Sequence, residues 1–193
     1  MKLAEIMDHL RQIMNERRYR HTLGVVQFAL EMAKIYGADS GQAQMAALLH
    51  DCARCLPPRE LLAAAEAQGI PVDDLEREIP DLLHGKVGAY LAGTRYGVSD
   101  PAVLQAIELH TLGARDMSTL DKIIFVADMV EPGRDFPGVG RLREMARRDL
   151  DRALLNCFDS TVRFVLEKQQ FIHPQSVIAR NALLLKLHKA AGT

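Results

Sequence analysis

Helical periodicity constrains this chain more than any other feature of its sequence. Between Leu142 and Leu166, core-type residues recur at spacings of three and four, which places them along one face of a helix. The residues on this face are Leu142, Met145, Ala146, Leu150, Ala153, Leu154, Cys157, Phe158, Thr161, Val162 and Val165. No run of alternating β-branched and aromatic residues is long enough for a strand, and aromatic residues are only 5% of the chain. The pattern predicts an all-α fold.

Capping signals divide this fold into about eight or nine helices. Asp39, Asp100 and Ser118 each precede an apolar run and are expected N-caps, because their side-chain oxygens can accept from free backbone amides. Four glycines are expected C-terminal caps, namely Gly37, Gly69, Gly97 and Gly113. We expect helices near residues 2–16, 18–36, 40–52, 58–68, 81–96, 101–111, 119–131, 141–169 and 176–189. Glycines and prolines predict an irregular stretch from Glu131 to Arg141.

Size and charge favour one soluble domain over residues 1–193. The chain is 48% hydrophobic and 25% charged, as globular proteins are. It carries 24 Lys and Arg against 25 Asp and Glu, so neither nucleic acid nor an anionic membrane surface is an expected partner. Glu5 and Asp8 interrupt the region where a signal peptide would be apolar, and three cysteines do not suggest a disulfide framework. We expect a cytoplasmic protein, and a homodimer stays open.

Histidine and aspartate on apolar helix faces are the informative chemical feature. His50 and Asp51 end the run MAALLHD, Asp128 lies within IIFVADMV, and His21 precedes LGVVQFAL. An imidazole or carboxylate that faces a core needs a partner to offset its desolvation. One such histidine is more often a hydrogen-bonded core residue, but two His and two Asp together offer mixed nitrogen and oxygen coordination. That donor set suits iron, manganese, cobalt or zinc better than Mg²⁺.

Two further histidines could reach the same cavity. His84, in DLLHGKVGAYL, and His110, in AIELHTLG, lie on amphipathic helices. They either hold a second metal ion, bridged to the first by Asp51, or donate to phosphate and leaving-group oxygens at a site with one ion. The sequence leans slightly toward one ion, because four ligands are already supplied. His9 and His188 are interpreted as surface residues.

The ordered set of these residues on helices resembles the HD-domain superfamily of metal-dependent phosphohydrolases. More specific are the strings YRHTLGV, AALLHDCAR, LLHGKVGAYLA, ELHTLG, KIIFVADMVEPGRDFPGV and FIHPQSVIARN, which run over nearly the whole chain. They are similar to the YqeK subfamily, the symmetrical hydrolases of diadenosine tetraphosphate. The resemblance implies an HD-type helical bundle in which His21, His50, Asp51 and Asp128 bind iron. It also implies a nucleotide substrate that is cut in the middle of its phosphate chain to give two ADP.

Several basic residues are candidates for binding the phosphates. Arg18 and Arg54 each lie three residues from an expected ligand and so share its helical face, while Arg134 lies in the irregular stretch. His173 and Arg180 belong to the family-like C-terminal string. Exposed arginines that flank a helix end are as often merely solvated as they are phosphate ligands. Arg143 and its neighbours alternate with acidic residues and are interpreted as the outer face of the long helix.

Other interpretations remain open at this point. A related enzyme could act on guanosine tetraphosphate or a nucleoside monophosphate, and a non-catalytic nucleotide-binding module would keep the same helices. Cys52 and Cys55 form a C-x-x-C pattern, but they follow a helix and have no second cysteine pair with which to bind zinc. A redox or zinc role for them is therefore disfavoured.

Overall fold

The computed structural model describes residues 1–192, and these residues form eleven α-helices and two short 3-10 helices with no strand. The all-α prediction is therefore confirmed, with more helices than the eight or nine expected. In chain order they are α1 (Leu3–Ile13), α2 (Glu16–Tyr36), α3 (Ser40–Leu49), η1 (Cys52–Cys55), α4 (Pro58–Ala67), α5 (Asp74–Glu78), η2 (Pro80–Leu83), α6 (His84–Thr94), α7 (Pro101–Leu109), α8 (Thr119–Val130), α9 (Val139–Arg148), α10 (Leu150–Glu167) and α11 (Pro174–Ala191).

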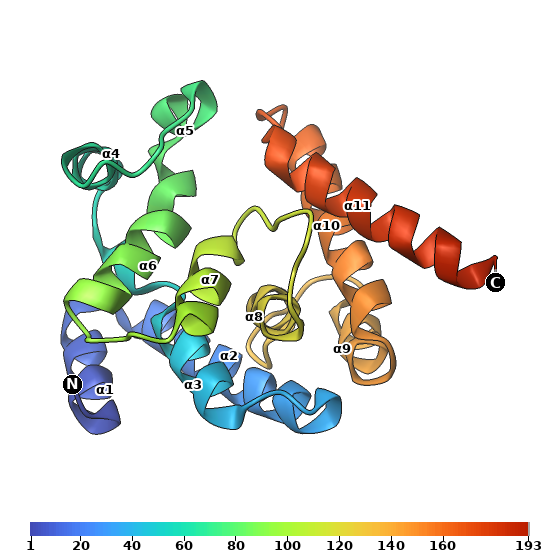
Figure 1. The fold of residues 1–193 in the computed structure, drawn as a ribbon, viewed down its shortest axis with the longest axis horizontal. Coiled ribbons are helices and arrows are strands. Elements are labelled where there is room, and N and C mark those ends of the chain that lie inside the picture. Colours follow the sequence, from blue (N-terminus) through green and yellow to red (C-terminus); the bar gives the residue numbers. More distant parts are fainter. Residues whose placement is uncertain (193) are drawn as a thin grey trace.

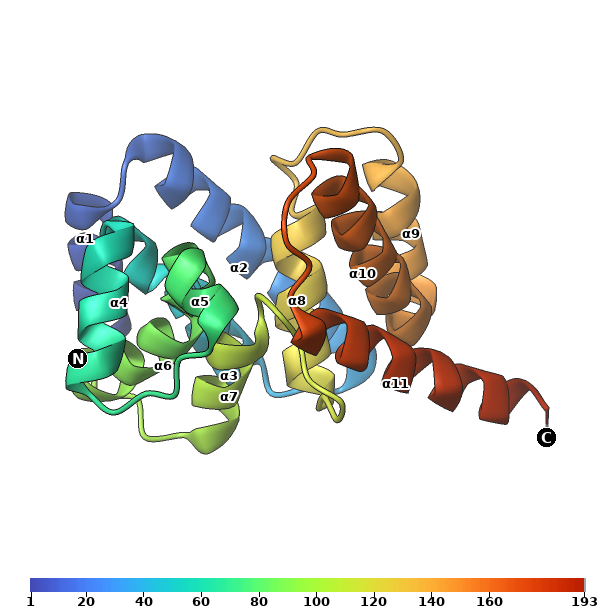
Figure 2. The ribbon, with the colours of Figure 1, turned by 90° about the horizontal axis from the view of Figure 1, so that it is seen from above.

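Helix α8 lies at the centre of the molecule. In Figure 1 it is seen nearly end-on, with α7 on one side and α9 and α10 on the other, and Figure 2 shows it standing between these two groups. It packs against α2, α3, α7, α9 and α10. A helix that is apolar all round is stable only when other elements cover it, and α8 buries Ile123, Ile124, Phe125, Val126 and Ala127. Asp128 is the only carboxylate in the second half of α8, so it lies among the helices that cover α8.

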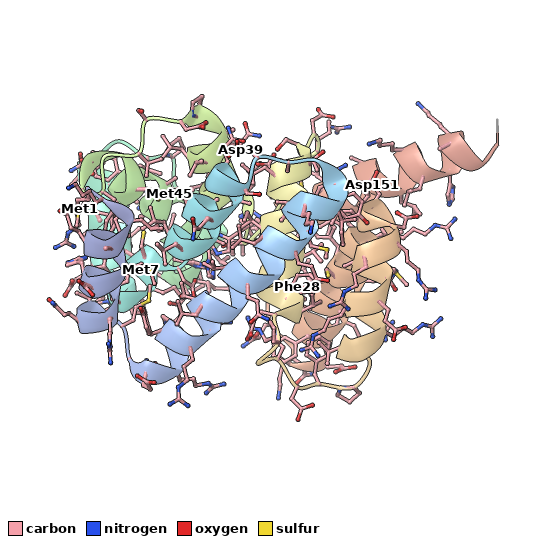
Figure 3. All side chains as sticks on the ribbon, turned by 90° about the horizontal axis from the view of Figure 1, so that it is seen from below. Met1, Met7, Phe28, Asp39, Met45 and Asp151 are labelled. Atoms are coloured by element: carbon pink, nitrogen blue, oxygen red, sulfur yellow. The ribbon has the colours of Figure 1, made fainter. Side chains whose placement is uncertain are left out.

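Helix α2 lies across α3 and α8 on one face of the molecule, as Figure 3 shows from below. Asn15 caps its N-terminus by accepting from the backbone N–H of Arg18. Gly37 ends it in the left-handed conformation, with φ 67°. Phe28, labelled in Figure 3, is buried on the inner side of α2. The same inner side carries His21 about two turns earlier.

The long C-terminal helix expected over 141–169 is two helices, and that prediction was wrong. The chain turns at Asp149, whose φ of −153° and ψ of 96° are extended. Its carboxylate accepts from the backbone N–H of Arg152 and caps the new helix. The apolar spacing continues across the break, so periodicity alone does not reveal it. Asp as an N-cap offers the backbone a competing hydrogen bond, and here that bond prevails.

Other boundaries differ locally. Helix α5 was not expected, although Asp73 and Glu76 form a capping box at its start. The first turn of the expected helix 81–96 is instead the 3-10 helix η2, which begins with Pro80. The N-caps Asp39, Asp100 and Ser118 are confirmed. The glycines expected as caps, Gly37, Gly69, Gly97 and Gly113, all have positive φ.

No helix in the described part of the chain combines the length and the apolar character needed to cross a lipid bilayer.

Candidate active site

Five helices bring the predicted residues to one cleft. His21 comes from α2, His50 and Asp51 follow the end of α3, and His84 begins α6. His110 follows α7, and Asp128 lies in the last turn of α8. The cleft has a volume of about 1260 Å³, and His21, Asp51, His84, His110 and Asp128 line it. His50 is fully buried behind them.

Three of the histidines are held by the same local hydrogen bond. Nδ1 of His50 lies 2.7 Å from the carbonyl oxygen of Ala47, and Nδ1 of His110 lies 2.6 Å from that of Ile107. Nδ1 of His84 makes the equivalent contact with the carbonyl oxygen of Asp81. A carbonyl oxygen only accepts, so each Nδ1 carries the hydrogen and donates it. In the neutral rings each Nε2 therefore presents a lone pair.

These Nε2 atoms are short of hydrogen-bond donors in the described part of the chain. Within residues 1–192, Nε2 of His50 is buried with no hydrogen-bond partner. Nε2 of His84 lies 3.0 Å from Nε2 of His110, so two lone pairs face each other. The hydroxyl of Thr111 lies 3.0 Å and 3.4 Å from these two nitrogens, but its single hydrogen can serve only one of them. The donor set therefore fits metal ions, which bind imidazole nitrogen through its lone pair.

Asp51 lies between two groups of histidines. Its Oδ2 is 3.8 Å from Nε2 of His50, whereas its Oδ1 is 3.6 Å from Nε2 of His84 and 3.9 Å from Nε2 of His110. Two sets of side chains offer ligand atoms close enough to share an ion, His21 with His50 and Asp51, and Asp51 with His84 and His110. The cluster can thus hold a metal ion, and Asp51 belongs to both sets.

Asp128 lies beside the two histidines of the first set. Its Oδ1 lies 2.9 Å from Nε2 of His21 and 3.9 Å from Nε2 of His50. Arg134 contacts Asp128 twice, because it donates to the backbone carbonyl at 2.9 Å and to Oδ1 at 2.8 Å. The carboxylate is thus held facing both histidines.

The electrostatics of the cluster suit ligands that bind in their deprotonated forms. Burial, followed by His110 and Arg54, lowers the pKa of His84 to about 3. Burial and His50 likewise lower the pKa of His110. Burial opposes ionisation of Asp51, but the surrounding histidines outweigh it and hold its pKa well below the usual range. Burial likewise opposes ionisation of Asp128, but its hydrogen bond with His21 and its electrostatic interactions with the neighbouring histidines keep its pKa low.

His21 differs from the other histidines. Burial lowers its pKa, but Asp128 and Glu131 reverse this effect and leave the pKa above its ordinary value. Its Nδ1 contacts a carboxylate of Glu131 instead of a backbone carbonyl. An acidic partner on each ring nitrogen is what sets this imidazole apart.

The structure places three of the predicted phosphate ligands at the cleft and two elsewhere. Arg18, Arg54 and Arg134 line it, and Arg18 lies 2.6 Å from Oδ2 of Asp51. His173 instead caps α11, and its Nε2 lies 2.8 Å from Asp73. Arg180 pairs with Asp159 at 2.8 Å beside a separate groove between α10 and α11. Substrate contacts of His173 and Arg180 stay predictions.

The remaining histidines and the cysteines lie outside the cleft. His188 is exposed, as expected, but His9 is half-buried and its Nδ1 lies 3.1 Å from the hydroxyl of Tyr96. Cys52, Cys55 and Cys157 are free thiols. Burial raises the pKa of Cys157 to about 12 and also raises that of Cys55.

Sequence reasoning missed Glu131 and misjudged Arg143. Glu131 is buried directly after α8, although it was expected only as the last residue of a helix and the first of the irregular stretch. Arg143 was interpreted as part of a solvated outer face, which was wrong. Its guanidinium donates to the carbonyl oxygens of Val130, Glu131 and Arg134, each at 2.7 Å. The only signal in the sequence for either role is Glu131 itself, an acidic residue at the end of a mostly apolar helix.

Comparison with known proteins agrees with this geometry. The model of the HD domain family matches residues 18–133, which include every residue of the His and Asp cluster. A Bacillus subtilis protein named symmetrical bis(5'-nucleosyl)-tetraphosphatase is 39% identical over 184 residues, or 95% of this chain and 98% of its own length. A Halalkalibacterium halodurans protein of the same name is 38% identical over 186 residues, or 96% of this chain and 99% of its own.

A solved structure shares the whole fold. The structure of a Clostridium acetobutylicum protein, described as a predicted HD superfamily hydrolase involved in NAD metabolism, superposes with a TM-score of 0.94 and 42% identity. The match covers 96% of this chain and 98% of that one, so it includes α9, α10 and α11, which lie beyond the family match. The matched segment with its His and Asp cluster, together with relatives similar over their full length, shows that the chain belongs to the HD-domain family.

Proposed function

We propose that this protein is a metal-dependent hydrolase that cleaves diadenosine tetraphosphate symmetrically into two ADP. The observation that carries the proposal is a buried His and Asp cluster, with Asp51 in both of its ligand sets, at the base of a cleft edged by arginines. The names of the full-length relatives support this substrate rather than guanosine tetraphosphate or a nucleoside monophosphate. The cleft, at about 1260 Å³, exceeds the ~300–1,000 Å³ of sites for drug-sized ligands, as a dinucleotide requires.

His21, His50, Asp51 and Asp128 are the proposed ligands of one ion, and Asp51, His84 and His110 those of a second. The sequence alone leaned toward one ion. A second is now favoured because Nδ1 of both His84 and His110 already donates to a carbonyl oxygen, so neither neutral ring has a hydrogen left for phosphate. When bound, such ions supply a nucleophile at neutral pH by lowering the pKa of water, and they polarise phosphoryl oxygens. The donor set suits iron, with manganese, cobalt and zinc as alternatives.

The arginines orient the phosphate chain in this proposal. Arg18 and Arg54 lie beside Asp51, and Arg134 lies beside Asp128. Guanidinium groups bind phosphate oxygens with paired, charge-assisted hydrogen bonds. Arginines beside both aspartates would hold the phosphate chain with its central phosphates over the proposed metal ligands. The cytoplasmic location and the homodimer remain predictions.

Product analysis tests the proposal. Protein purified without oxygen and supplied with Fe²⁺ or Mn²⁺ should convert diadenosine tetraphosphate into ADP alone, as measured by anion-exchange chromatography. The variants His50→Ala and Asp128→Ala should lose nearly all turnover, because each removes a proposed ligand. Equal amounts of AMP and ATP would contradict symmetrical cleavage. Turnover confined to guanosine tetraphosphate or nucleoside monophosphates would reassign the substrate, and no turnover of any nucleotide would indicate a binding module.

A further inference from the structure

Glu131 is a buried carboxylate that the predicted site did not include. It directly follows α8, three residues after Asp128, and is only 4% exposed. Its Oε1 lies 3.1 Å from Nδ1 of His21, while Nε2 on the opposite edge of that ring lies 2.9 Å from Asp128. An acid buried this deeply is costly unless it is fully hydrogen-bonded. The contacts around Glu131 therefore indicate what it does.

Both oxygens of this carboxylate accept a hydrogen bond. Nδ1 of His21 donates to Oε1, and the backbone N–H of Gly133 donates to Oε2. A carboxylate supplies two acceptors, whereas a carboxamide of the same shape supplies one acceptor and one donor. A carboxylate at this position therefore offers an acceptor to each donor, whereas a carboxamide would leave one of them without an acceptor.

The surroundings leave room for this carboxylate and hold its backbone in place. A Cβ on Gly24, one turn after His21 on α2, would collide with Oε2 of Glu131. Across the loop, Arg143 donates to the carbonyl oxygens of Val130, Glu131 and Arg134. Close approach of the α2 backbone thus requires glycine at position 24, and a guanidinium fixes the loop that carries the acid.

We propose that Glu131 is a positioning residue, which accepts the hydrogen of Nδ1 of His21 and so leaves Nε2, beside Asp128, as the ring nitrogen available to a metal ion. This inference rests on the proposed function, because it takes His21 to be a ligand. The other buried histidines use a backbone carbonyl for the same purpose. A carboxylate partner additionally raises the basicity of a coordinating imidazole.

Cobalt binding gives a test that does not depend on turnover. Metal-free wild-type protein and Glu131→Gln are titrated with Co²⁺ in the presence of a competing chelator, and the visible absorption of bound Co²⁺ reports affinity. Loss of such an outer partner typically weakens metal binding about 10- to 100-fold, and we expect Glu131→Gln to fall in this range. Binding by Glu131→Gln equal to wild type would overturn the role of Glu131. A wild-type protein that binds no Co²⁺ would instead count against the proposed function.

A second variant keeps the inference testable if Glu131→Gln folds poorly. Gly24→Ala should weaken Co²⁺ binding in the wild-type background, because the new methyl group displaces the carboxylate. In a Glu131→Ala background the same change should have little further effect, since the colliding atoms are gone. Gly93→Ala, in α6 where the nearest atom to a new Cβ is 3.7 Å away, is the matched control and should bind Co²⁺ as the wild type does. Equal losses from Gly24→Ala in both backgrounds would overturn the inference.

Discussion

Three buried histidines are each held by a hydrogen bond to the backbone carbonyl oxygen three residues earlier in the chain. His50, His84 and His110 each lie just beyond or at a helix end, where the carbonyl oxygen of residue i−3 can accept from Nδ1. This bond fixes both the tautomer and the direction of the ring. The sequence could predict that these residues face inward, because their neighbours are apolar. It could not predict the tautomer, which depends on where each helix ends.

Arg54 provides a prediction at the scale of one side chain. Its Nε lies 3.4 Å from Oδ1 of Asp51, and its side chain is 36% exposed, so it can turn toward bound phosphate. We expect Arg54→Ala to lower kcat/KM about 10- to 100-fold, since a charge-assisted hydrogen bond contributes ~1.5–3 kcal/mol. Metal content per chain should not change.

The matched control for Arg54 is Arg59, an exposed arginine of α4 that does not line the cleft. Arg59→Ala should have the kinetics of the wild type. If Arg54→Ala also keeps wild-type kcat/KM, Arg54 is a solvated surface residue and takes no part in binding phosphate.

At the scale of helices, apolar spacing predicted the elements well and their ends poorly. Helices α2, α3, α7 and α8 were placed to within a few residues, because their caps are signalled by Asn, Asp, Ser or Gly. The break between α9 and α10 was missed because the apolar face continues through Asp149. Arg143 was misjudged for the same reason, since in one long helix it would have faced solvent. Its actual partners include the carbonyl oxygens of Val130 and Glu131, which lie 13 and 12 residues earlier in the chain.

Asp149 provides a prediction at this scale. Its carboxylate caps α10 through the backbone N–H of Arg152 and also lies 3.2 Å from the guanidinium of Arg152. We expect Asp149→Ala to lower the free energy of unfolding by about 1 kcal/mol, the usual loss for an N-cap, as measured by urea denaturation. Arg152→Ala removes only the exposed ion pair and should change the stability by less than about 0.5 kcal/mol. Equal losses in the two variants would show that the cap does not stabilise α10.

At the scale of the whole molecule, the site depends on contacts between distant segments. Asp128 of the central helix α8 meets His21 of α2, more than a hundred residues earlier in the chain, and His50 beyond α3. The sequence supplied the types of residue in the cluster and their apolar surroundings. The position of Asp51 between two sets of histidines follows only from how α3, α6 and α7 pack together. The spacing of these residues in the sequence does not predict that arrangement.

Metal content per chain, measured by mass spectrometry on protein purified without oxygen, tests the metal cluster most directly. We predict two transition-metal ions in the wild type and about one in His110→Ala, which leaves the set of His21, His50 and Asp51 intact. Asp51→Ala should lose both ions, because its carboxylate belongs to both sets, while circular dichroism shows that the helices persist. Two ions retained in Asp51→Ala, or an active wild-type protein that holds no transition metal, would contradict the account.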